Sequence, residues 1–125
     1  MNSMFSNCSS LTSIDVLKIN TENVTHMVGL FFDCSSLTSI DIINSDNVTN
    51  MGYMFGFCRS LTSIDVTKFN TEKVSNMCFM FSGCSSLTSI DVTNFNTEID
   101  SYMGNKFYEC SSLISIEVSN YNILI

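Results

Sequence analysis

One phrase recurs five times along this chain, and in its commonest form it reads CSSLTSIDV. Each copy begins at a cysteine, and the cysteines lie 24 to 26 residues apart, at Cys8, Cys34, Cys58, Cys84 and Cys110. A fixed period of this size is typical of repeat architectures, in which each unit buries its apolar face only against its neighbours. The sequence therefore predicts one small structural unit that is stacked about five times.

The repeats account for the whole chain, so we expect a single solenoid domain over 1–125. Its repeats are 1–7 (partial), 8–33, 34–57, 58–83, 84–109 and 110–125 (partial). Hydrophobic residues make up 45% of the chain and charged residues 14%. This composition supports a continuous core and argues against intrinsic disorder.

Three positions of the phrase are apolar in every repeat, as Leu61, Ile64 and Val66 illustrate in the third. The Ile and the Val lie on either side of an acidic residue, and this alternation predicts a short strand of sequence SIDV in each repeat. An Asn-Thr-Glu step follows the strand in three repeats, starting at Asn20, Asn70 and Asn96. Asn and Thr at such a step can accept a bond from free backbone N–H groups.

The segment that leads to the next cysteine has apolar residues at helical spacing, namely Val74, Met77, Met80 and Phe81 in one repeat. This spacing predicts a short α or 3-10 helix as the return segment. The Met and Phe of each return segment recur in register, and such stripes are typical of a core rather than a cofactor site. The predicted fold class is an α/β repeat with a parallel β-sheet on one side and helical returns on the other.

The pattern LxxIxV within a repeat of this length resembles the leucine-rich repeat. More closely, the string MFSGCSSLTSIDVTNFNTE at Met80 to Glu98 is similar to the BspA-like leucine-rich-repeat family, the bacterial surface protein 26-residue repeat. The resemblance covers essentially the whole chain. It implies a leucine-rich-repeat solenoid in a surface or secreted protein, with adhesion or binding to host matrix as the role.

Two repeats depart from this pattern. The second is two residues short around Ser45 and Asp46, which predicts a tighter turn with less core. In the fourth, Asp100 stands where other repeats have Val, and Lys106 replaces an apolar residue. An irregular return segment is expected there.

The acidic position of the phrase forms a column that should lie on one face. Its members are Asp15, Asp41, Asp65, Asp91 and Glu117. One interpretation is an ordinary solvated strand face. The other is a docking stripe for a basic partner, or a loose surface for divalent cations. A dedicated calcium site needs six to eight converging oxygens, so we predict neither a specific metal site nor a cofactor.

Most of the five cysteines in register are expected to be small buried residues with intact thiols, and Cys78, outside the register, is the better candidate for an exposed thiol. The only histidine, His26, has no catalytic motif near it. Arg59 could pair with a nearby carboxylate. No set of acid, base and nucleophile can be assembled from these columns, so we do not expect an enzyme.

The favoured function is a non-enzymatic binding or adhesion module that recognises a protein, such as host matrix or a cell-surface protein. The alternative is a structural subunit that stacks head to tail through uncapped ends into a filament.

Twelve Asp and Glu against five Lys and Arg give a net charge of −7, which argues against nucleic acid and anionic membranes as partners. No apolar run is long enough for membrane insertion. An extracellular or cell-surface location follows from the resemblance alone, since no signal peptide is recognisable.

Overall fold

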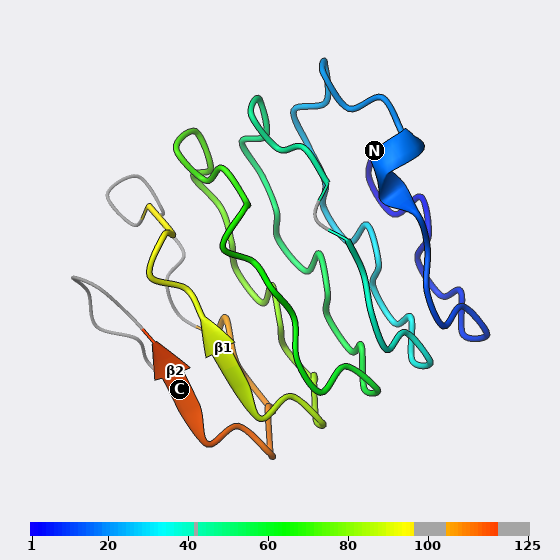
Figure 1. The fold of residues 1–125 in the computed structure, drawn as a ribbon, viewed down its shortest axis with the longest axis vertical. Coiled ribbons are helices and arrows are strands. Elements are labelled where there is room, and N and C mark those ends of the chain that lie inside the picture. The colour runs from blue at the N-terminus through cyan, green and yellow to red at the C-terminus, as the bar shows by residue number, and fades with distance from the viewer. Residues whose placement is uncertain (42, 97–104, 118–125) are drawn as a thin grey trace.

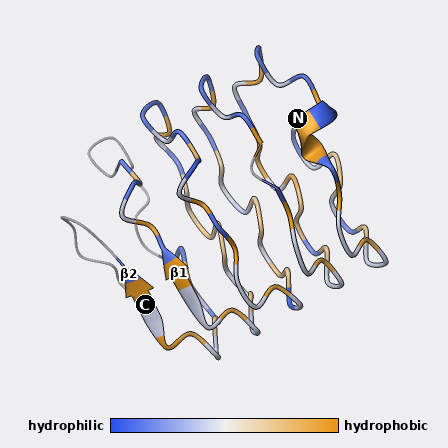
Figure 2. Ribbon diagram, viewed as in Figure 1, coloured by the Kyte–Doolittle hydropathy of each residue, from blue (hydrophilic) through white to orange (hydrophobic). Residues whose placement is uncertain are grey.

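The computed structural model describes residues 1–41, 43–96 and 105–117. Successive turns of the chain lie side by side, from the N-terminal turn at one end to β1 and β2 at the other (Figure 1). Each turn has a SIDV segment, such as 63–66, and a return segment that precedes the cysteine, such as 51–57. Hydrophilic residues gather at the tips of the turns on one side of the stack (Figure 2).

Regular secondary structure is sparse in the described part of the chain. It consists of η1, a 3-10 helix at Val16–Lys18, and two strands, β1 at Ser89–Asp91 and β2 at Ser115–Glu117. The strands pair in parallel, with Ile90 opposite Ile116. The predicted fold class, an α/β leucine-rich-repeat solenoid with helical return segments, is therefore wrong. Turns replace the expected helices, and over the described residues the sheet has only two strands.

The return segments are not helical because each contains two residues, four apart, in the left-handed region. Their φ angles lie between 54° and 71°, and the pairs are Ser3 and Asn7, Gly29 and Asp33, Tyr53 and Phe57, Phe79 and Gly83, and Asn105 and Glu109. A right-handed helix requires negative φ at every residue. The apolar residues at helical spacing from Val74 to Phe81 therefore face the core because of a turn, and a helix is not needed to explain their spacing.

Hydrogen bonds between neighbouring turns replace the bonds that a helix would make. The N–H groups of Phe31, Phe55 and Phe81 donate to the carbonyls of Met54, Met80 and Lys106, each at 2.9 Å. Other alternate residues of the return segments bond in the same way, as Tyr53 N–H does to the carbonyl of Cys78 at 2.9 Å. The result is a ladder of backbone bonds that joins the return segments of all five turns.

Fewer backbone hydrogen bonds join neighbouring SIDV segments than join neighbouring return segments. Thr38 N–H donates to the carbonyl of Thr12 at 2.9 Å, and Thr88 N–H to that of Thr62 at 3.2 Å. Beyond these threonines, no backbone hydrogen bond joins 13–15 to 39–41, or 39–41 to 63–65, in the described chain. Over the described residues, the expected strand therefore forms only at β1 and β2.

The predicted core is confirmed at most positions. The Met, Phe and Leu columns of the inner turns are almost fully buried, at Met27, Met51, Met77, Phe31, Phe55, Phe81, Leu37, Leu61 and Leu87. Rings of the Phe column stack from turn to turn at 5.5–5.6 Å with interplanar angles of 5–8°. Of the Val or Ile column, Val16, Val66 and Val92 are buried. Ile42, Val118 and Met103 lie outside the described residues.

All six cysteines are free thiols. Cys34, Cys58, Cys84 and Cys110 are buried, as predicted, and each thiol donates to the carbonyl of a Phe in the preceding turn, at 3.0–3.2 Å. Burial raises the pKa of Cys84 to about 12 and that of Cys110 to about 11. Burial of most cysteines in register is therefore confirmed. Cys8 is exposed and Cys78 is half-buried, so the prediction that Cys78 is the better candidate for an exposed thiol was wrong.

The described parts of the two irregular repeats share features with the other repeats. In the short second repeat Ile43 is buried, and buried Ser45 both donates to the Asn70 carbonyl at 3.1 Å and accepts from the Asn70 N–H at 3.0 Å. Lys106 is buried in the column that elsewhere holds Leu or Met, and its return segment over 105–109 keeps the left-handed pair. Asp100 lies outside the described residues.

The Asn of the Asn-Thr-Glu step accepts a backbone hydrogen bond, as predicted. The Oδ1 atoms of Asn20 and Asn70 each accept from the N–H of the Glu two residues later, at 3.0 Å. Asn44 does the same for Asp46 at 2.9 Å in the short repeat. These bonds fix the tip of each turn.

A glycine substitution tests the left-handed turns. At Gly83, φ is +71° and an added Cβ would lie 2.7 Å from Cε1 of Phe57. Gly83→Ala should lower the free energy of unfolding by about 1–3 kcal/mol, through backbone strain and this overlap. Gly52→Ala is the control in urea denaturation, since the nearest atom to its Cβ would be Asn50 Oδ1 at 3.3 Å. An equal loss of unfolding free energy in both variants would contradict the left-handed turn at Gly83.

Thiol reactivity tests the burial of the cysteine column. Exposed Cys8 should react fast with a thiol reagent at pH 8, and half-buried Cys78 more slowly. The thiols of Cys34, Cys58, Cys84 and Cys110 should react only on unfolding, because burial raises their pKa values. Mass spectrometry of timed alkylation identifies the sites. Fast labelling of Cys58 in the folded protein would contradict this packing.

Candidate functional site

The acidic stripe predicted from the sequence consists of Asp15, Asp41, Asp65, Asp91 and Glu117. Four of these side chains are exposed and Asp91 is half-buried. Asp91 and Glu117 lie opposite each other on the paired strands β1 and β2. At the other end of the stripe, the SIDV segments are not paired and hollows separate their acidic residues.

Three of the aspartates hold the chain that follows them. Asp15 Oδ1 accepts from the Leu17 N–H at 3.2 Å, which caps η1. Asp65 Oδ1 accepts from both the N–H and the hydroxyl of Thr67, at 3.0 and 2.6 Å. Asp91 makes the same two bonds with Thr93, at 3.0 and 2.7 Å. These carboxylates therefore have a structural role in addition to any contact with a partner.

Asp41 differs from its neighbours. Its carboxylate makes neither a hydrogen bond nor an ion pair with any described residue. The cause is visible in the sequence, because the second repeat lacks the two residues that correspond to Thr67 and Lys68. Without that Thr, no hydroxyl is available two residues after Asp41. Within the described chain, the shortened repeat thus leaves Asp41, alone among the four aspartates of the stripe, with an unengaged carboxylate.

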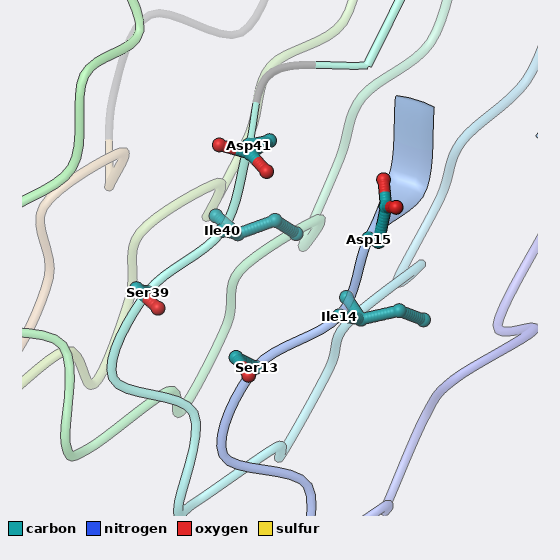
Figure 3. A pocket seen from close by; sticks show the side chains of 6 residues that line it. All are labelled: Ser13, Ile14, Asp15, Ser39, Ile40 and Asp41. Carbon is teal, nitrogen blue, oxygen red and sulfur yellow. The ribbon is translucent and has the colours of Figure 1, made fainter. Parts of the chain in front are cut away.

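Two hollows border Asp41. The larger, of about 340 Å³, lies between the first two SIDV segments and is lined by Ser13, Ile14, Asp15, Ser39, Ile40 and Asp41. Figure 3 shows these six side chains, three from each of the two neighbouring SIDV segments. The second, of about 210 Å³, is lined by Leu17, Ile40, Asp41, Asp65 and Lys68. The stripe is therefore recessed around Asp41 and has apolar as well as acidic walls.

The electrostatics of the stripe are mainly acidic, with two basic residues at its edge. Lys18 Nζ lies 3.4 Å from Asp15 Oδ2, and both side chains are well exposed. Bonds from the Thr67 hydroxyl and N–H lower the pKa of Asp65, and Lys68 lowers it further. The Thr93 N–H and hydroxyl lower the pKa of Asp91. Near neutral pH, Asp65 and Asp91 therefore carry full negative charge.

The geometry provides carboxylates and hydroxyls but no converging ligand set. Over the residues that the structure describes, no three His, Cys, Asp or Glu side chains are grouped so that they could hold a metal ion. In the same part of the chain, no helix is long and apolar enough to cross a membrane. The arrangement can attract and orient a cationic group.

The sequence identified the column of carboxylates but missed the residues between them. Leu17 and Lys68, which line the second hollow, follow the phrase and lie in less regular columns. Ser13 and Ser39, which line the first hollow, belong to the recurring phrase itself. The length of the second repeat was the available signal, because a two-residue deletion just after Asp41 removes the capping Thr.

Removing one hydroxyl at a time tests these caps. Thr67→Val should raise the pKa of Asp65, because the Thr67 hydroxyl is the largest cause of its lowering. Thr93→Val should raise the pKa of Asp91 less, because the Thr93 N–H, which remains, is the largest cause there. NMR titration of the carboxyl carbons measures both.

The stability linked to these groups has a defined pH range. Because both folded-state pKa values lie below the ordinary 3.8, the stabilisation is complete above that pH and is lost as the pH falls through the lowered values. In the Thr→Val variants this loss should begin at higher pH. Unchanged pKa values in both variants would rule out the caps.

The chain was compared with curated proteins, solved structures and protein families. Neither curated proteins nor solved structures include a significant match to this chain. The model of the family described as "Mycoplasma protein of unknown function, DUF285" matches residues 1–122. The match covers almost the whole chain, so the protein belongs to the DUF285 family.

Proposed function

We propose that this protein is a non-enzymatic binding module whose acidic stripe docks a basic segment of a protein partner. The observation that carries the proposal is the unengaged carboxylate of Asp41, bordered by two hollows that Asp15 and Asp65 also line. A lysine or arginine side chain entering either hollow would meet two carboxylates and the apolar wall of Ile40. The net charge of −7 favours approach of a cationic partner.

The apolar wall matters because a purely charged surface binds weakly in water. Exposed ion pairs contribute about 0–1 kcal/mol each. Lysine and arginine also have long aliphatic stems that pack on apolar surface while the charged group remains solvated. Ile14 and Ile40 beside Asp15 and Asp41 offer both kinds of contact.

The resemblance to BspA-like repeats supports an adhesive role on the outside of a cell or in a secreted protein. In that setting the partner is a protein of host matrix or of a cell surface. Catalysis is not part of the proposal, and the carboxylates that bond the hydroxyls of Thr67 and Thr93 are interpreted as structural caps.

A matched pair of charge deletions tests the site. Asp41→Asn should weaken binding of a twelve-residue peptide of alternating lysine and glycine by roughly three- to fivefold at low salt. Asp91→Asn removes the same charge from the part of the stripe on the paired strands, and it should have a smaller effect. Fluorescence anisotropy with labelled peptide gives both dissociation constants.

The triple variant with Asp41, Asp65 and Asp91 all changed to Asn should bind weakest and show the shallowest salt dependence. Lys68→Gln, which removes a competing cation from the second hollow, should strengthen binding. Equal effects of Asp41→Asn and Asp91→Asn would show general electrostatic attraction and would remove the site at Asp41. Unchanged binding in the triple variant would remove the whole stripe.

A further inference from the structure

A second surface of the protein has five aromatic side chains in contact. They belong to the return segments of the second to fifth turns and are Phe32, Tyr53, Phe57, Phe79 and Tyr108. We call this set the aromatic surface. It uses different columns from the acidic stripe, which lies on the SIDV segments.

The rings form a continuous chain of contacts. The Phe32 ring meets Tyr53 at 6.1 Å and Phe57 at 5.5 Å, both edge to face. Tyr53 stacks on Phe79 with centroids 4.9 Å apart, and Phe79 meets Tyr108 at 6.4 Å. The surface therefore spans four turns without a break.

The core does not require these rings. Tyr53 is 37% exposed and Tyr108 51% exposed, and the other three are half-buried. At the equivalent positions of other turns the chain has small polar residues, such as Asn105 for Tyr53 and Ser82 for Tyr108. The fold thus tolerates polar residues there, and the core already contains the stacked Phe column.

Glycines beneath the rings hold the surface in place. A Cβ on Gly56 would lie 3.0 Å from Cδ2 of Phe32, and one on Gly83 would overlap the Phe57 ring. Both rings therefore lie directly against the backbone of the next turn. The ladder of backbone bonds fixes that backbone, so a partner would meet preorganised rings.

The surface already binds one cation of its own chain. Arg59 Nη1 lies 2.7 Å from Asp33 Oδ1, and the guanidinium carbon lies 5.1 Å from the centroid of the Phe57 ring. The pairing of Arg59 with a carboxylate, expected from the sequence, is confirmed. One guanidinium is thus bound by an aromatic ring and a carboxylate together. Arginine stacks on aromatic rings and pairs with carboxylates, so this combination suits an arginine side chain.

We propose that the aromatic surface docks an arginine-rich segment of a partner protein. Tyr108 is followed by exposed Glu109, so a second ring and a second carboxylate are neighbours in the sequence at the other end of the surface. Between them, Tyr53 is 37% exposed and gives a cationic group a further aromatic ring to contact. The net charge of −7 complements such a segment, and the proposal does not depend on the acidic stripe.

The test uses substitutions that the repeat itself provides. Tyr53→Asn introduces the residue found at Asn105, which also suits the left-handed φ of 55° at Tyr53, and Tyr108→Ser introduces the residue found at Ser82. The probes are two twelve-residue peptides, one alternating arginine and glycine and the other lysine and glycine. Fluorescence anisotropy measures their binding, and circular dichroism confirms folding of each variant.

The arginine peptide should bind the unchanged protein more tightly than the lysine peptide. The double variant Tyr53→Asn/Tyr108→Ser should weaken arginine-peptide binding by roughly five- to tenfold and lysine-peptide binding by less than about twofold. If Tyr53→Asn does not fold, the same comparison with Tyr108→Ser alone decides. Asp41→Asn should weaken binding of both peptides, so the stripe and the aromatic surface can fail independently.

Three outcomes would overturn the proposal. One is unchanged arginine-peptide binding in the folded variants, and another is an equal loss for both peptides. The third is a concentration-dependent dimer, seen by analytical ultracentrifugation, that Tyr53→Asn abolishes. That result would assign the aromatic surface to a second copy of this chain.

Discussion

The backbone ladder between return segments is the interaction on which this structure depends. Bonds such as Phe31 N–H to Met54 carbonyl and Phe55 N–H to Met80 carbonyl, both 2.9 Å, set the spacing of the turns. This spacing stacks the Phe rings at 5.5–5.6 Å and allows each buried thiol to reach the carbonyl of the preceding turn. Fewer backbone bonds join the first three SIDV segments, and two hollows border Asp41 there.

The sequence predicted which residues are buried better than it predicted their backbone. Burial depends on side-chain character that recurs in every repeat, as at Met77 and Leu87, so the columns could be read directly. The helix prediction failed because the apolar spacing of a helix also fits a turn with two left-handed residues. Gly29 and Gly83 hinted at such turns, but Tyr53 and Phe79 occupy the same conformation with residue types that gave no hint.

The acidic stripe shows a similar division between regular and irregular features. Its column was predictable because one acidic residue recurs in the phrase, whereas the capping of Asp65 by Thr67 depends on local geometry that periodicity does not report. The repeat that departs from the others is the most informative. Loss of two residues after Asp41 leaves the fold intact, since Ile43 and Ser45 fill the turn, yet it leaves one carboxylate unengaged.

On the return side, the residues that the fold requires differ from the residues that are available for recognition. A residue that every turn requires, such as the buried Phe of the ladder, reports on the fold. A residue that replaces a small polar one in only some turns, as Tyr53 and Tyr108 do, costs apolar exposure without being needed for stacking. In a stack of near-identical turns, the surfaces open to selection for binding are therefore the positions where the turns differ. Both Asp41, by its missing cap, and the aromatic surface, by its added rings, are such positions.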